Sequence, residues 1–378
     1  MEGVLDVPQG KFKLQRLPYR HNDQLRAWDA ADEYLLQHLF EQDSLKTDRK
    51  VLILNDSFGA LGCALHKFSP TVISDSWLSQ HATKQNLTAN NITEHSIELR
   101  DSLDWTTQSF NIVLIKVPKT LAYFEQQLIH LQKILTADTV VIAAGMVKAM
   151  PASVWKLMER YVGITKPSLA KKKARLIFAT VDLSLEQVKS PYPVYYQLEN
   201  TDYNICNHAN VFSRDSLDIG SRFLLQYLPK NIQAKDIVDL GCGNGVVGLM
   251  LAQNHDSANL HFVDESYMAV ASAKETFQRA FEGRSAEYYV GDGLTKFKAE
   301  SMDLIVCNPP FHQQNTIGNQ IALSMFKQSY RVLKKAGELR VIGNRHLGYH
   351  LDLKKEFGQC KEVASNKKFV IWQAIKQN

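Results

Sequence analysis

The sequence has few cysteines, no long apolar run and no strong excess of charge of either sign. Its five cysteines are widely spaced and form no Cys-x-x-Cys pair, so neither a disulfide-stabilised secreted fold nor a structural metal site is expected. The apolar runs are far shorter than the roughly 18 residues that a membrane-spanning helix needs. The acidic first residues do not resemble a secretory signal. These absences predict a protein of the reducing cytoplasm, without a metal and without a membrane anchor.

The composition is that of a globular chain with more than one domain. Its 378 residues predict two or three domains, at roughly 150 residues per domain. Hydrophobic residues make up 45% and charged residues 22%, which excludes wholesale disorder and collagen-like repeats. The net charge of +5 permits a nucleic-acid partner but does not require one.

Short apolar runs alternate with amphipathic stretches in both halves of the chain, which predicts parallel sheets covered by helices. In the first half we expect strands at 51–54, 71–73, 97–99, 112–115 and 139–143, and helices at 78–90 and 121–135. In the second half we expect strands at 237–240, 260–263, 288–290, 304–307 and 339–342, and helices at 246–253, 268–281 and 321–333. The fold class is therefore α/β, with the same rhythm twice.

The two halves also match in sequence. Residues 51–62 align with 237–248, which lie 186 positions further on, and 172–177 align with 367–372. Residues 115–118 fall opposite 306–309. We predict an internal duplication with domains 1–190 and 191–378, separated near Pro191 and Pro193.

A glycine-rich turn follows the strand at 237–240. Its glycines, Gly241, Gly243 and Gly245, come two, four and six residues after Asp239 and let the backbone turn tightly and lie close to a ligand. Asp264, at the end of the next strand, is placed to accept hydrogen bonds from ribose hydroxyls. The combination predicts a nucleoside site; a purely structural turn is the alternative.

This spacing differs from the Gly-x-Gly-x-x-Gly dinucleotide fingerprint and resembles the first motif of S-adenosylmethionine-dependent methyltransferases. The resemblance implies S-adenosylmethionine as cofactor, with the glycine turn beside its methionyl part and Asp264 at its ribose. It also implies that Asp292, after the third strand, lies at the adenine. An exposed turn aspartate is the alternative for Asp292.

The tetrapeptide Asn308-Pro309-Pro310-Phe311 follows the strand at 304–307. A ring-attached amino group is a poor nucleophile, and the Asn308 amide oxygen and the Pro309 carbonyl can each accept one of its N–H groups. The prolines offer no competing N–H, and Phe311 can stack on a flipped base. We predict these four residues as the catalytic set, with Asn308 also touching the donor. An Asn-Pro turn with a core phenylalanine is the alternative.

The first half lacks these residues and is predicted to be a degenerate copy. The replacements are Ile53 for Asp239, Asn55 for Gly241, Ser57 for Gly243 and Val117 for Asn308. A basic stretch near its end suits phosphate contacts, so this half is expected to bind substrate; a solvated charged face is the alternative. The basic residues proposed to contact RNA are Lys171, Lys172, Lys173 and Arg175.

Nearly the whole chain resembles the bacterial ribosomal RNA guanine-N2 methyltransferases with two tandem methyltransferase-like domains, the RsmC and RlmG group. The resemblance is carried by residues 308–313, 207–214, 217–221 and 344–347, and residues 51–61 and 116–119 are closest to the large-subunit branch, RlmG. It implies two tandem Rossmann-like class I methyltransferase domains, the first degenerate, and S-adenosylmethionine-dependent methylation of the exocyclic N2 of a guanosine in 23S ribosomal RNA.

The same resemblance implies that Phe212, Ser213, Asp218 and Gly220 line the pocket. A helix start capped by Ser213 or Asp215 is the alternative. Other functions stay open: methylation of adenine N6 or of a protein glutamine amide, or a non-catalytic RNA-binding assembly factor. The sequence does not specify the guanosine, or whether the RNA is met naked or in a particle. It leaves the oligomeric state open, with a monomer favoured.

Overall fold

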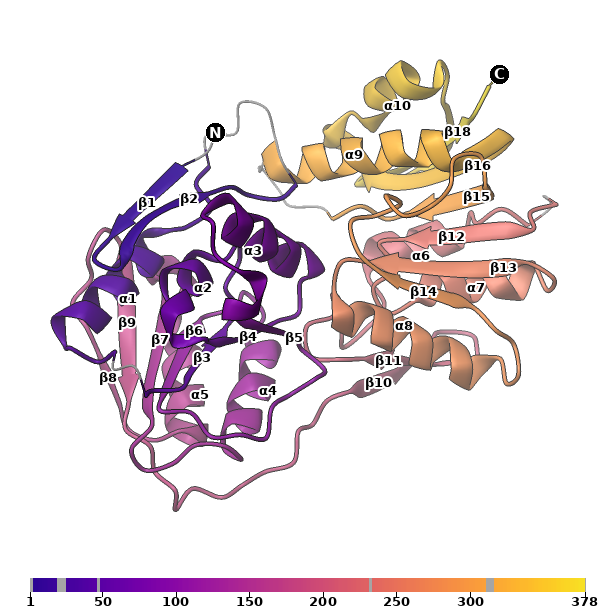
Figure 1. Cartoon of the computed structure of the whole chain (residues 1–378). Helices are drawn as coiled ribbons and strands as arrows, with labels where there is room; N and C mark the ends of the chain where they lie inside the picture. The colour runs from indigo at the N-terminus through magenta and orange to yellow at the C-terminus, as the bar shows by residue number, and fades with distance from the viewer. Residues whose placement is uncertain (1–2, 19–24, 46–47, 231–232, 311–315, 378) are drawn as a thin grey trace. The chain divides into compact units, whose positions relative to one another are not determined.

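The computed structural model describes residues 3–18, 25–45, 48–230, 233–310 and 316–377. The chain folds into two compact units, Met1–Tyr192 and Pro193–Asn378. Each unit contains a seven-stranded sheet with helices on both sides (Figure 1). The predicted α/β class with two methyltransferase-like domains is confirmed, and each unit is described below by itself.

The second unit has the strand order β14-β13-β12-β15-β16-β18-β17, in which β18 alone runs antiparallel to its neighbours. A separate hairpin, β10 (Val194–Gln197) and β11 (Asn204–Asn207), precedes it. The strands of the sheet are β12 (Asp236–Leu240), β13 (Asn259–Asp264), β14 (Glu287–Val290), β15 (Met302–Cys307), β16 (Leu333–Asn344), β17 (Lys361–Ser365) and β18 (Phe369–Ile375). The helices are α6 (Ile219–Leu225), α7 (Val246–Asn254), α8 (Tyr267–Ala280), α9 (Thr316–Val332) and α10 (Tyr349–Phe357).

Two apolar cores, one on each face, hold this sheet. Successive residues of β12 point to opposite faces, so Ile237 packs into a core with α7 and α8 while Val238 packs into one with α9 and α10. Both faces are buried, which explains why the central strands read as continuous apolar runs. Because β12, β13, β14 and β15 are parallel, their carboxyl ends lie at the same edge of the sheet.

The first unit repeats this topology in the order β5-β4-β3-β6-β7-β9-β8. It adds an N-terminal hairpin that the sequence did not predict, β1 (Gly3–Val7) and β2 (Gly10–Leu14). Its sheet comprises β3 (Val51–Leu54), β4 (Thr71–Ser74), β5 (Glu98–Asp101), β6 (Ile112–Lys116), β7 (Val140–Met146), β8 (Thr165–Pro167) and β9 (Ala174–Ala179). Its helices are α1 (Ala30–Glu41), α2 (Ala60–Ala64), α3 (Trp77–Ala89), α4 (Leu121–Leu131) and α5 (Ala152–Tyr161).

Strand register supports the duplication and corrects one of its details. Leu54 pairs with Ile115 in the first unit, and Leu240 pairs with Cys307 in the second. Lys116 therefore stands opposite Asn308, and the prediction that Val117 does so was wrong. The sequence match aligned Pro118 with Pro309. Counted from the equivalent paired residues Ile115 and Cys307, however, the proline of the first unit comes one position later than that of the second.

Two predicted helix ends also differ. The helix expected at 121–135 ends at Leu131, and Leu333, expected to end a helix, begins β16. Among the residues that the structure describes, none of the helices is both long and apolar enough to cross a membrane.

Candidate functional site

The glycine turn follows β12 at the edge where the strand ends meet. Gly241, Gly243 and Gly245 have φ values of 75°, 54° and 78°, in the left-handed region that favours glycine. A Cβ on Gly245 would lie 2.8 Å from the Ala273 backbone of α8, whereas a Cβ on Gly243 would meet nothing within 4 Å. Gly245 therefore permits close packing of α7 on α8, and Gly243 leaves open space beside the turn.

Asp239 lies beneath this turn and is 3% exposed. Its Oδ2 accepts a hydrogen bond of 2.7 Å from the Gly248 N–H, so it holds the first turn of α7 against the strand. Burial raises the pKa of Asp239 to about 8, because a carboxylate is costly in an apolar core. Its position supports the turn from inside the fold.

Asp264 ends the neighbouring strand, β13, and faces the turn. Its Oδ2 accepts from the Gly243 N–H at 3.0 Å, and its Oδ1 accepts from Ser266 N–H at 3.0 Å. The next strand, β14, leads into Gly291, where a Cβ would meet nothing within 4 Å. Half-buried Asp292 follows it. The structure thus brings the acids predicted for ribose and adenine to adjacent strand ends, with open backbone between them.

Asn308 comes directly after β15, on the other side of β12. Its Nδ2 donates to the Ser221 hydroxyl at 3.0 Å, and its buried Oδ1 has no partner among the described residues. Its backbone carbonyl lies 3.8 Å from the Cβ position of Gly241, so Asn308 borders the glycine turn. Pro309 is buried and Pro310 exposed. Phe311 lies outside the described residues.

The segment before α6 leads into the helix whose third residue, Ser221, contacts Asn308. Phe212 is 71% exposed, and the Ser213 hydroxyl donates to the Ser216 carbonyl at 2.8 Å within a tight turn. The cap of α6 is Asp218, whose Oδ2 accepts from the Ser221 N–H at 2.8 Å. The alternative cap at Ser213 or Asp215 was therefore wrong, because the helix begins only at Ile219.

Ser221 is the residue of this site that the sequence prediction missed. A signal existed, because a serine three residues after a capping aspartate occupies the N3 position of a helix. That signal predicts the place of Ser221 in the helix but not its contact with Asn308, which is 87 residues away in the sequence.

In the first unit, side chains fill the place of the glycine turn. Asn55 takes the left-handed conformation, with φ 66°, at the position of Gly241. Its amide exchanges two hydrogen bonds with Gln127, at 2.9 and 2.8 Å, and donates to the Lys116 carbonyl. The space that a ligand would need beside the turn is thus taken by this unit's own side chains.

Asp56 does for the first unit what Asp239 does for the second. Its Oδ1 accepts from the Ala60 N–H at 3.0 Å, and its Oδ2 accepts from the Gly62 N–H at 2.7 Å. Gly62 occupies the position of Gly248. The first unit has Ile53 in the strand where the second has Asp239, and Asp56 in the following loop anchors the start of the helix instead.

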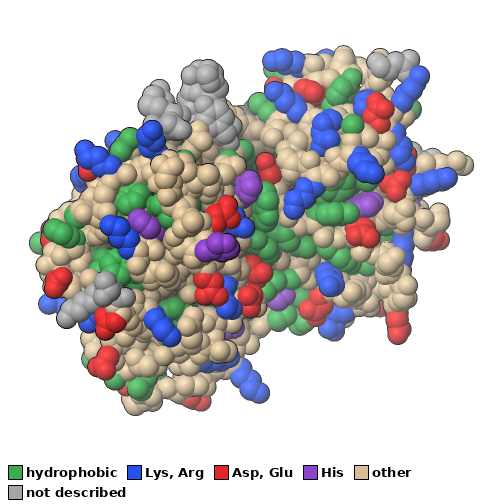
Figure 2. All heavy atoms as spheres, in the orientation of Figure 1, with side chains coloured by type: hydrophobic (Ala, Val, Ile, Leu, Met, Phe, Trp, Pro, Cys, Tyr) green, Lys and Arg blue, Asp and Glu red, His purple; other side chains and the backbone are tan. Residues whose placement is uncertain are grey.

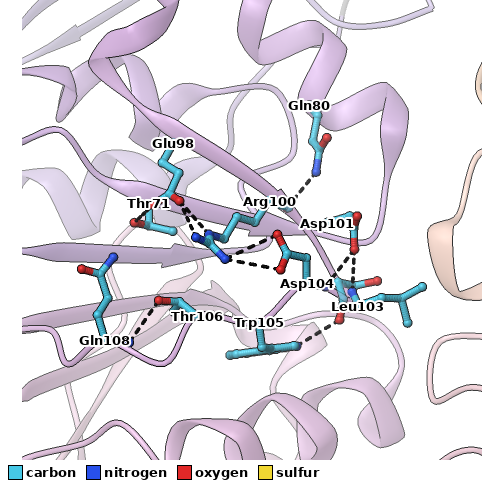
Figure 3. Close-up of polar contacts among 11 residues, drawn as sticks. Thr71, Gln80, Glu98, Arg100, Asp101, Leu103, Asp104, Trp105, Thr106 and Gln108 are labelled. Carbon is cyan, nitrogen blue, oxygen red and sulfur yellow. Dashed lines mark hydrogen bonds and ion pairs between the residues drawn. The ribbon is translucent and has the colours of Figure 1, made fainter.

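The third strand end of the first unit is also closed by polar contacts (Figure 3). Arg100 pairs with Glu98 at 2.7 Å and with Asp104 at 3.4 Å. Asp101 accepts from the N–H groups of Leu103 and Asp104. By strand register Leu103 stands opposite Asp292, so no acid occupies the adenine position here.

The predicted RNA-contacting residues lie in and beside the turn between β8 and β9. Lys172 and Lys173 have positive φ values, and the Lys172 ammonium pairs with Glu33 at 2.7 Å. The Lys171 ammonium lies 4.8 Å from the Tyr34 ring centroid. Arg175 is the second residue of β9 and is half-buried. Figure 2 shows Lys and Arg side chains interspersed with Asp and Glu on both units, so a local cluster must carry any RNA affinity.

The second unit contains three side chains that could together hold a metal ion, although the sequence predicted no metal site. Potential ligand atoms of Cys206, His208 and Glu275 lie within 4.8 Å of one another. Glu275 accepts from the Tyr195 hydroxyl at 2.7 Å and pairs with Arg279 at 3.3 Å. Burial raises the pKa of the Cys206 thiol to about 12. We assign this group a packing role, because its acid is already engaged by two partners.

Comparison with known proteins decides the family. Residues 2–183 match the RLMG N-terminal domain, and residues 202–373 match the methyltransferase small domain. Ribosomal RNA large subunit methyltransferase G of Psychromonas ingrahamii is 44% identical over 100% of both chains, and that of Stutzerimonas stutzeri is 47% identical over 99% of both. The chain belongs to the RlmG family.

A solved structure shows the same fold as this RlmG family member. The 16S rRNA N2 methyltransferase RsmC of T. thermophilus, in complex with AdoMet and guanosine, matches with a TM-score of 0.78 over 100% of this chain and 98% of that chain. The two share 19% identity, so this likeness concerns the fold. It covers both units, which agrees with the tandem arrangement.

Asp239 in the second unit and Asp56 in the first each predict how the stability of the protein changes with pH. Burial raises the pKa of Asp239 to about 8 and that of Asp56 to about 6, from 3.8. The folded chain therefore keeps protons that the unfolded chain releases, and the free energy of unfolding falls as pH rises from about 4 to these values. An asparagine at 239 still accepts the Gly248 N–H through its Oδ1 and does not ionise. An asparagine at 56 does not ionise either, but it accepts only one of the two N–H groups that Asp56 binds, so D56N loses one contact at every pH.

We expect D239N to gain stability over the parent as pH rises from about 4 to 8, by at most about 1.4 kcal/mol per pH unit. The gain of D56N should stop near pH 6. Urea unfolding followed by circular dichroism at several pH values measures both. Curves that stay parallel to that of the parent would contradict the assignment.

Proposed function

We propose that the second unit transfers a methyl group from S-adenosylmethionine to the exocyclic N2 of a guanosine in 23S ribosomal RNA, in the cytoplasm. One observation carries the proposal: Asn308 presents a buried Oδ1, without a partner among the described residues, at a strand end that borders the glycine turn. A lone acceptor beside an open backbone suits an amino group. Membership of the RlmG family supports the large-subunit RNA, and the N2 activity and guanosine named for RsmC support the guanosine amine.

The residues at the strand ends fit the donor. Space lies open at Gly243 and Gly291, and the Asp264 carboxylate between them can accept from ribose hydroxyls. Asp292 follows at the place suited to the adenine. When bound, S-adenosylmethionine supplies an electrophilic methyl group on its sulfonium. Its methionyl part would lie along Gly241, next to Asn308.

Asn308 and Pro309 prepare the acceptor nitrogen. The Asn308 Oδ1 and the Pro309 carbonyl each accept one N–H of the amino group, which turns the nitrogen lone pair toward the methyl carbon. Neither Pro309 nor Pro310 offers a competing N–H. The rate then comes from positioning and from hydrogen bonds to the developing charge, and the methylated nitrogen releases its extra proton to solvent.

Nucleoside analysis tests this function. The purified protein is incubated with S-adenosylmethionine carrying a labelled methyl group and with 23S ribosomal RNA from cells that lack the protein. N2-methylguanosine is the expected product. Labelled methyladenosine or a labelled protein amide would overturn the choice of acceptor. Absence of donor binding in calorimetry would favour the non-catalytic assembly factor.

We propose further that the first unit contributes to RNA binding and takes no part in methyl transfer. Its glycine-turn position is filled by Asn55 and Gln127, and Lys116 replaces Asn308. Of the exposed lysines between β8 and β9, Lys172 pairs with Glu33, whereas Lys171 and Lys173 form no ion pair among the described residues and can meet phosphates.

A charge-matched comparison tests the lysines of the first unit. In the full chain, K171A/K172A/K173A should weaken 23S RNA binding by at least about tenfold at 0.1 M salt and flatten the salt dependence, because each phosphate contact contributes a slope of about 0.7–0.9. The control K354A/K355A/K361A removes three exposed lysines of the second unit. Equal losses in the two variants, measured by gel shift, would reduce the effect to net charge alone.

A further inference from the structure

We propose that Ser221 is a positioning residue for the methyl transfer: its hydroxyl holds the Asn308 side chain so that Oδ1, and not the amide NH2, faces the amino group of the substrate. The inference rests on the proposed function, because it concerns the group that receives the substrate amine. It begins from the asymmetry of an asparagine amide, in which one end only accepts hydrogen bonds and the other only donates.

The orientation of Asn308 decides whether it can assist the reaction. A substrate amino group brings N–H donors, so it pairs with the amide oxygen and would face the NH2 end donor to donor. In the structure the Nδ2 end is occupied by Ser221 Oγ at 3.0 Å, and Oδ1 has no partner among the described residues. A buried acceptor without a partner costs about 1–3 kcal/mol. In the structure the contact of Nδ2 with the Ser221 hydroxyl is the one that keeps Oδ1 turned away from Ser221.

Ser221 is itself rigidly placed. It is the third residue of α6, is 8% exposed, and donates its backbone N–H to the capping carboxylate of Asp218 at 2.8 Å. A Cβ on the adjacent Gly220 would approach Asp218 to 2.9 Å and Phe369 to 3.3 Å, so α6 lies close against the end of β18. The hydroxyl therefore meets Asn308 from a fixed position, as a positioning group requires.

The first unit contains the same contact with different chemistry. There Asp29 caps α1, Asp32 is its third residue, and the Lys116 ammonium binds both carboxylates at 2.7 Å. Lys116 stands opposite Asn308 in strand register. In both units the third residue of the capped helix thus binds the residue at the same register position, Lys116 at the end of β6 and Asn308 just after β15.

This pair of contacts shows what the second unit gains. The Lys116 ammonium offers only donors and binds two carboxylates, so this side chain has no acceptor for a substrate amine. The pairing of a hydroxyl with an amide keeps the fixed contact while leaving one oxygen for the substrate. In the first unit the residue on the helix therefore forms an ion pair with Lys116. In the second unit it orients the Asn308 amide so that Oδ1 can accept a hydrogen bond.

The variants S221T and S221V test the role, because threonine and valine have nearly the same shape and differ by the hydroxyl. We expect S221V to lower kcat on 23S RNA about 10- to 100-fold, with less than threefold change in the donor dissociation constant and in the KM for RNA. S221T should recover kcat to within about threefold of the parent. Equal kcat values for the two variants would overturn the proposal.

A second measurement does not depend on activity. In protein labelled with 15N-asparagine, the side-chain NH2 signals of Asn308, assigned by their loss in N308D, should shift in S221V and return toward the parental position in S221T. If no N2-methylguanosine forms but these signals respond, the positioning contact stands and the assigned reaction fails. Unchanged signals in S221V would refute the contact itself.

Discussion

Replacing Asn308 by alanine is expected to lower kcat for RNA methylation about 10³-fold while the protein stays folded and still binds S-adenosylmethionine. Removing one preorganised hydrogen-bonding group from a reacting centre costs about 10²–10³ in rate, and the buried Asn308 Oδ1 has no partner among the described residues and is free to accept from a substrate. Alanine leaves the substrate amine with the Pro309 carbonyl alone. Single-turnover incorporation of labelled methyl groups measures the loss.

Three controls make this result specific. Calorimetry should give a donor dissociation constant within about threefold of the parent, and circular dichroism should show an unchanged spectrum. Q226A, which removes an exposed amide from the same unit, should retain full activity. Retention of most activity by N308A would sink the role assigned to the asparagine. Loss of donor binding in N308A would move that role from the acceptor to the cofactor.

The largest expected loss of stability comes from one methyl group at Gly248. In the third position of α7, an added Cβ would overlap the Phe262 ring at the centre of a buried core. Overpacking a well-packed core costs about 1–3 kcal/mol and sometimes more, and a central aromatic ring has little room to move. We expect G248A to destabilise the second unit by about 3 kcal/mol, measured by urea unfolding.

The duplication supplies a matched control for this substitution. Gly62 holds the corresponding position in α2, but a Cβ there would meet Asp56 Oδ2 at 3.4 Å and Ile97 at 3.6 Å, which are ordinary contacts. Alanine also favours a helix over glycine by about 1 kcal/mol, so G62A should be neutral or stabilising. A G248A protein as stable as G62A would show that Phe262 has freedom to move away.

Much of the fold could be predicted from the sequence because its signals are local. The apolar runs that became β3, β6, β12 and β15 are buried on both faces, so their composition alone marks them. The hairpin of β1 and β2 was missed because each strand has only five residues, of which β2 alone alternates clearly between polar and apolar side chains. That Lys116 is equivalent to Asn308 became clear only from the strand register, because aligning the prolines of the two halves had paired Asn308 with Val117.

The candidate site divides in the same way. The glycine turn and the acids at Asp264 and Asp292 stand at fixed distances along the chain from strand ends, and parallel strands bring such ends to one edge. The roles proposed for Phe212 and the basic turn stay predictions, because exposure alone does not identify a ligand. Phe311 also stays a prediction.

By itself the sequence determined the α/β class with two similar domains, and it predicted a nucleoside-binding turn and an amine-accepting tetrapeptide in the second half. Only the tertiary structure decided which way the Asn308 amide faces and how the first half is closed. These depend on contacts between Ser221 and Asn308, and between Asn55 and Gln127, residues 87 and 72 positions apart. Such distant partners meet only after sheet and helices pack, so no spacing in the chain records them.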